Sequence, residues 1–70
     1  MLGERSGIVK ELRAVDIHGA RFVDVMVVLD DGSTLEGRLG AESVPADLQP
    51  DDRVLAAAVM STMVQIRRPD

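Results

Sequence analysis

The dipeptide Asp31-Gly32 constrains the fold of this chain more than any other feature, because it separates two stretches that favour extended backbone. A type I′ turn needs positive φ at both central residues, and Asp-Gly tolerates it. Residues 22–29, before the dipeptide, are rich in β-branched valine and apolar on both faces apart from Asp24. Residues 34–39, after it, alternate with the period of two of a half-buried strand. The sequence therefore predicts a β-hairpin whose first arm is a central or doubly buried strand.

Gly37 falls on the inward side of the second arm. A glycine inside a strand commonly marks a bulge or a bend at a barrel corner. The position therefore favours a curved sheet, although a simple weak point in the strand is the alternative.

Residues 40–52 form a connection rather than a regular element. Pro45 and Pro50 both lack the N–H that a helix or a central strand needs. We expect at most one short helical turn, within residues 41–47. Pro50 then begins a turn that leads into an extended segment, residues 53–59.

Residues 53–68 have two interpretations that local pattern leaves open. A helix is favoured by aspartates that can cap its start and arginines that suit its C-terminal dipole. Apolar residues, however, occur all around the projected helix. A strand over 53–59, a turn at Ser61-Thr62 and a second strand over 63–68 fit as well.

The N-terminal segment is also ambiguous. Ile8, Leu12 and Val15 lie at helical spacing, whereas Gly7-Ile8-Val9 fits an edge strand. Local pattern does not decide between them.

The length of the chain gives room for one domain. We place it at residues 7–68, between tails at 1–6 and 69–70. A chain of 70 residues buries only about 60% of the surface that it exposes when unfolded. Disulfides, metals or oligomerisation usually compensate, and this chain has no cysteine and one histidine. We therefore expect a homo-oligomer.

Composition argues against several classes of protein. Single-stranded nucleic acid is held by aromatic platforms in basic grooves, but the only aromatic residue here is Phe22 and the net charge is −4. The longest apolar run, residues 54–60, is far shorter than the roughly 20 residues of a membrane span. Residues 1–5 lack the apolar region of a secretory signal. With no cysteine, these features predict a cytoplasmic protein that binds neither membrane nor nucleic acid.

The sequence contains few side chains in arrangements that could catalyse a reaction. The one histidine, His18, lies in an expected loop and has no nucleophile arranged beside it. The carboxylate pairs Asp30-Asp31 and Asp51-Asp52 fall at expected turns, where aspartate bonds its own backbone. We therefore expect no enzymatic activity, no metal and no cofactor.

Short motifs spread over most of the chain indicate a family. They are Gly7-Ile8-Val9, the apolar strand ending in Asp31-Gly32, the strand Thr34–Leu39, Glu42-Ser43-Val44, the segment Leu48–Val54, and Ser61-Thr62-Met63-Val64. With them, the chain from Gly7 to Ile66 resembles the TOBE domains and, among these, the Mop-like molybdate-binding proteins, or molbindins. Glu-Ser-Val followed by a leucine, a turn and a valine strand is the most specific part.

The resemblance implies an all-β, OB-like barrel of five strands, in which the last segment forms two strands. It also implies an oligomer that binds an oxyanion such as molybdate at its subunit interfaces. The side chains expected to bind the ligand are Ser43, Ser61 and Thr62. Those expected to face a partner subunit are Met60, Met63 and Val64. The family's basic ligand residues have no counterpart here, so a structural or regulatory protein-interaction domain without a small ligand is the alternative. An OB-like nucleic-acid-binding domain is a third, less favoured one.

Overall fold

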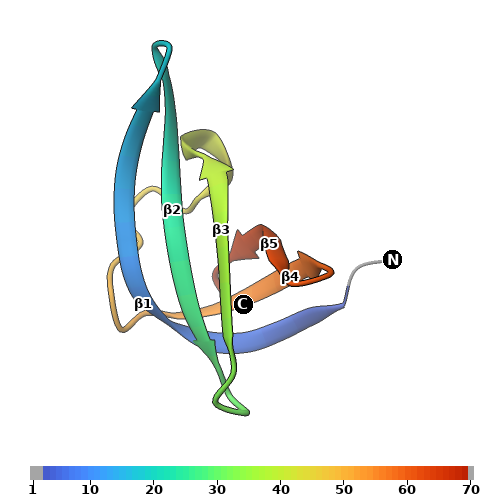
Figure 1. The fold of residues 1–70 in the computed structure, drawn as a ribbon. Coiled ribbons are helices and arrows are strands. Elements are labelled where there is room, and N and C mark those ends of the chain that lie inside the picture. Colours follow the sequence, from blue (N-terminus) through green and yellow to red (C-terminus); the bar gives the residue numbers. More distant parts are fainter. Residues whose placement is uncertain (1–2, 70) are drawn as a thin grey trace.

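The computed structural model describes residues 3–69, which form a closed five-stranded β-barrel (Figure 1). The elements are β1 (Glu4–Ile17), β2 (Ala20–Leu29), β3 (Thr34–Gly40), the 3₁₀ turn η1 (Ala41–Ser43), β4 (Arg53–Val59) and β5 (Thr62–Arg67). The strand order is β1-β2-β3-β5-β4, and β4 pairs with β1 to close the barrel. Strands β3 and β5 pair in parallel, whereas the other neighbours are antiparallel. This confirms the predicted OB-like barrel. The helical interpretation of 53–68 is wrong.

The predicted hairpin is present, and β2 is a central strand between β1 and β3. Its loop is not the predicted type I′ turn, because only Gly32 of the dipeptide has positive φ, at 88°. The Gly32 N–H donates to the Leu29 carbonyl at 2.8 Å, and the Leu29 N–H donates to the Ser33 carbonyl at 2.7 Å. These bonds define a three-residue loop with a left-handed glycine. The Asp31 carboxylate accepts from the Ser33 N–H at 2.9 Å and stabilises it.

A two-residue loop with positive φ at both positions does occur, at the tip of the β1–β2 hairpin. It consists of His18, with φ 50°, and Gly19, with φ 82°. Ile17 and Ala20 pair on either side of it. The sequence placed His18 in a loop but gave no sign of this hairpin, which extends beyond the barrel in Figure 1.

Strand β1 pairs with both β2 and β4. The N-terminal segment is therefore neither the edge strand nor the helix that the sequence left open. Residues 4–8 pair with β4, and residues 7–17 pair with β2. The register shifts between Val9 and Glu11, and such a bulge bends a strand. Figure 1 shows the resulting curve, which carries the start of β1 beneath the barrel. Residues 4–6, expected in a tail, thus belong to the sheet.

Gly37 lies in β3 at its contact with β5. A Cβ atom there would overlap the carbonyl oxygen of Met63 and would lie 3.0 Å from the Met63 Cβ. The register between β2 and β3 continues through Gly37 without a shift. Of the two features expected at this glycine, a bulge or a bend at a barrel corner, the bulge is therefore absent, and the glycine is required by the close approach of two backbones.

The core consists of aliphatic side chains from all five strands. Its most completely buried large members are Val9, Val27, Val54 and Met63. The connection 41–52 contributes Val44 and Leu48, which pack against this core. Residues 3–69 include no helix with the length and apolarity needed to cross a membrane.

Candidate functional site

The β4–β5 hairpin carries the large hydrophobic side chains that the described chain leaves exposed. Met60 is 96% exposed, Val59 is 50% exposed and Val64 is 41% exposed. Exposed apolar side chains that lie close together often mark an interaction site. We call these three residues the apolar tip.

The backbone at Met60 strengthens this observation. Met60 has φ 59° in the two-residue loop between the paired residues Val59 and Thr62. Left-handed φ is unfavourable for a side chain with a Cβ, and hairpins usually have glycine, asparagine or aspartate there. A fully exposed methionine at a strained loop position is not explained by folding.

The predicted interface residues separate into two groups. Met60 and Val64 are exposed, as an interface requires, but Met63 is 1% exposed and belongs to the core. Assigning Met63 to an interface was therefore wrong. Its side chain points into the barrel because successive residues of a strand face opposite sides of the sheet.

The three predicted ligand residues are all exposed, but one barrel does not bring them together. Ser61 and Thr62 are adjacent to the apolar tip. Thr62 pairs with Glu36 of β3, whereas Ser43 follows the far end of that strand. Glu36 and Gly40, four steps apart in this strand, are themselves separated by about 13 Å. Binding between subunits remains a prediction.

An apolar cleft of about 260 Å³ lies between the β1–β2 hairpin and the connection after β3. Leu12, Ala14 and Val23 line its hairpin side, and Val44 and Leu48 line the other. The polar residue in its wall is Arg13, and Ser43 directly precedes Val44. Sequence reasoning missed this cleft because its walls come from distant segments.

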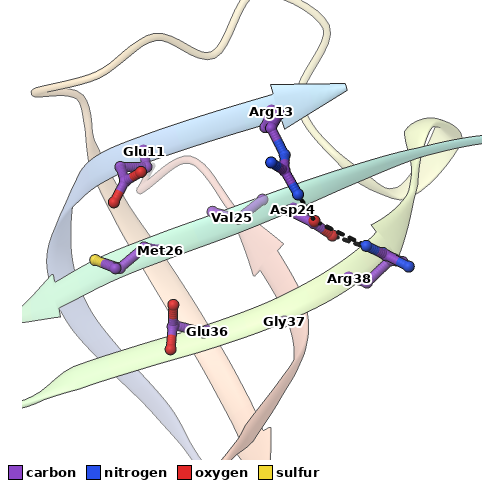
Figure 2. A pocket seen from close by; sticks show the side chains of 8 residues that line it. All are labelled: Glu11, Arg13, Asp24, Val25, Met26, Glu36, Gly37 and Arg38. Carbon is purple, nitrogen blue, oxygen red and sulfur yellow. Dashed lines mark hydrogen bonds and ion pairs between the residues drawn. The ribbon is translucent and has the colours of Figure 1, made fainter. Parts of the chain in front are cut away.

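A second hollow, an open groove of about 500 Å³, crosses the outer face of β1, β2 and β3 (Figure 2). Two rows of side chains form its walls, each row in register across the three strands. One row is Glu11, Met26 and Glu36, and the other is Arg13, Asp24 and Arg38.

Ion pairs hold the second row together. Arg38 donates two hydrogen bonds to Asp24, at 2.7 and 2.9 Å, and Arg13 donates one at 3.4 Å. The bonds from Arg38 lower the pKa of Asp24 from its ordinary value of 3.8, and Arg13 adds a smaller effect in the same direction. Two guanidinium groups thus share one carboxylate, and the row keeps a net positive charge.

Metal ligands do not gather in the described part of the chain, where no three acidic or histidine side chains are placed to hold an ion. Comparisons with protein-family models, curated proteins and solved structures found no match for this chain. The TOBE and molbindin resemblance thus rests on sequence motifs alone.

Proposed function

We propose that the protein is a non-enzymatic module that assembles with copies of itself through the apolar tip. The observation that supports this most directly is the 96% exposure of Met60 in a left-handed loop position. Unfavourable backbone conformations persist at positions that serve a function. Burying the tip against another molecule would remove its apolar surface from water.

The apolar cleft is the surface that suits the tip on a neighbouring copy. Methionine is unbranched and adapts to irregular cavities, and the cleft volume of about 260 Å³ leaves room for its side chain. Tip and cleft lie on different parts of the barrel, so the contact is head-to-tail. Repeating such a contact produces a closed ring or an open filament, depending on the rotation between copies.

Oxyanion binding is a second function that this assembly favours. Docking the tip in the cleft would bring Ser61 and Thr62 of one copy toward Ser43 and Arg13 of the next. Arg13 has the longest bond to Asp24 of the two arginines beside that carboxylate, 3.4 Å, and its side chain is largely exposed. Hydroxyl groups and one guanidinium are groups that bind a tetrahedral oxyanion.

Light scattering at tens of micromolar protein tests the assembly. A mass that rises with concentration is expected, whereas a strictly monomeric protein would reject the proposal. Calorimetry with molybdate, tungstate and sulfate then tests the second function. The expected result is heat with the oligomer that disappears in a Met60→Asn variant; no heat at millimolar anion would reject oxyanion binding alone.

A further inference from the structure

The outer face of β1, β2 and β3 carries four rows of side chains, each in register across the three strands. Two of them are the charged rows of the outer groove, which Figure 2 shows. One end row, toward the tip of the β1–β2 hairpin, consists of Val15, Phe22 and Gly40, and the other consists of Ile8, Val28 and Thr34. All four rows point away from the core, because the intervening residues of β2 are buried in it.

The two end rows are largely apolar but do not belong to the core. Phe22, the only aromatic residue of the chain, pairs with Val15, and Val28 pairs with Ile8. These four side chains are partly exposed and are not among the residues that form the core or pack against it. An apolar row at each end of one sheet face is thus available to a partner.

The two middle rows have opposite charge. Arg13 and Arg38 share Asp24, so we call theirs the positive row. Glu11 and Glu36 form the ends of the other, the negative row. Within residues 3–69, neither of these glutamates forms an ion pair with another residue.

Over the whole face, these charges nearly cancel. Lys10 precedes Glu11 at the bulge, and the Glu42 carboxylate lies close to where a Cβ atom of Gly40 would be. With Lys10 and Glu42 included, the face carries three basic and four acidic side chains. Such a face gives little net attraction to a basic or an acidic partner. The separation of charge into rows favours instead a partner with the same rows in the opposite order.

A second copy of the chain is such a partner. When it is turned over about an axis that runs along the face between the two middle rows, Arg13 lies opposite Glu11 of the other copy. Arg38 lies opposite Glu36 in the same way, and each contact occurs twice by symmetry. One apolar end row then lies opposite the other. Packed sheets are about 10 Å apart, a gap that long side chains from both copies can bridge.

We propose that the outer face is a two-fold interface between copies of this chain, in which the positive row of each copy lies over the negative row of the other. The four rows extend about 20 Å along β2 and about 14 Å across three strands, which gives about 300 Å² per copy. A standard stable interface buries about 800 Å² per partner. The pair is therefore weak, and it forms at high concentration or between copies that another contact already holds together.

This contact is distinct from the head-to-tail contact of the apolar tip. It uses β1, β2 and β3, whereas the tip lies on the β4–β5 hairpin. It is isologous, so by itself it joins copies only in pairs. Where both contacts form, two rings or two filaments are joined face to face.

Methyl NMR of the Met60→Asn variant tests the proposal without the tip. We expect the methyl groups of Met26 and Val28 to shift as the protein concentration rises from about 0.05 to about 2 mM. Those of Val27, which is buried in the core, should shift much less. This result does not depend on whether the tip contact exists. Methyl groups of Met26 and Val28 that stay in place up to about 2 mM would overturn the proposal.

Reversing one charge pair tests the orientation of the two copies. In the same background, Glu36→Arg and Arg38→Glu each place like charges opposite one another, and each should weaken the pairing by about fivefold or more. An equimolar mixture of the two variants restores opposite charges at this position and should recover the shifts. Thermal melting shows whether Arg38→Glu, which loses its bonds to Asp24, is folded. Glu36→Arg breaks no ion pair within residues 3–69 and gives the loss by itself.

Asp16→Arg is the matched control. It makes the same change of charge as Glu36→Arg, but on the opposite face of the β1–β2 hairpin, where Asp16 pairs with Arg21. The control should pair as well as the parent variant. A loss as large in the control, or a mixture that pairs no better than its separate components, would contradict the proposal.

Discussion

Replacing Met60 with asparagine should stabilise the single barrel and abolish its assembly. The side chain of Met60 is 96% exposed, so its removal costs the monomer almost no buried apolar surface. Its φ of 59° is left-handed, a conformation that costs about 1–2 kcal/mol for an ordinary residue. Asparagine tolerates this conformation at turns.

The size of the effect follows from that strain. If asparagine recovers about half of it, the free energy of unfolding of the monomer rises by about 0.5–1 kcal/mol. For a domain of 60–100 residues, 1 kcal/mol shifts Tm by about 4–8 °C. The expected rise in Tm is therefore about 2–8 °C, measured at low micromolar protein so that assembly adds little stability to the wild type. Light scattering at tens of micromolar should show a monomer.

His18→Asn is the matched control for this variant. His18 also has positive φ, 50°, in a two-residue hairpin loop, but it lies at the tip of the β1–β2 hairpin. It should raise Tm by a similar amount and leave the mass in solution unchanged. The reasoning is refuted if Met60→Asn remains as oligomeric as the wild type, or if it lowers Tm while His18→Asn raises it.

Two further predictions concern the barrel itself. Gly37→Ala would force Cβ into the Met63 carbonyl and should lower the free energy of unfolding by about 3 kcal/mol, which a lower urea midpoint would show. Gly3→Ala is the control and should change the midpoint little, because the space around Gly3 is open. Equal shifts in the two variants would contradict the close approach of β3 and β5. The pKa of Asp24 is lowered from 3.8 chiefly by Arg38, so its stabilisation is present above the unfolded value and is lost as pH falls through the lower folded value. Asp24→Asn should therefore flatten the pH dependence of the urea midpoint below about pH 4, and an unchanged slope would count against this ion pair.

The parts of the fold that the sequence predicted are those with local causes. Residues 22–29 and 34–39 show extended character in their own composition, and the glycine of Asp31-Gly32 supplies the left-handed position of the loop. The turn type was mistaken because Asp-Gly suits two kinds of hairpin loop. Here the hydrogen bond that the Ser33 N–H donates to the Asp31 carboxylate stabilises the three-residue loop.

The parts that the sequence did not predict depend on partners far along the chain. The sequence alone allows either a bulge or a bend at Gly37, and only the approach of Met63 from β5 explains why this residue is a glycine. The position of the β4–β5 loop also depends on pairing between strands. The loop lies at Met60-Ser61 and not at Ser61-Thr62, so that Thr62 pairs with Val59. Successive residues of β5 face opposite sides of the sheet, so Met63 is buried where its neighbour Val64 is exposed.

The two candidate surfaces differ in how far sequence can reveal them. The sequence predicts Met60 and Val64 at an interface, and both side chains are exposed on the single barrel. The outer groove was not predicted, because its charge is set by register. If β1 ran without its bulge after Val9, Lys10 would lie opposite Met26; the bulge places Glu11 there. The same irregularity that bends β1 between its two neighbours thus gives the groove two carboxylates around Met26 in place of one carboxylate and an ammonium.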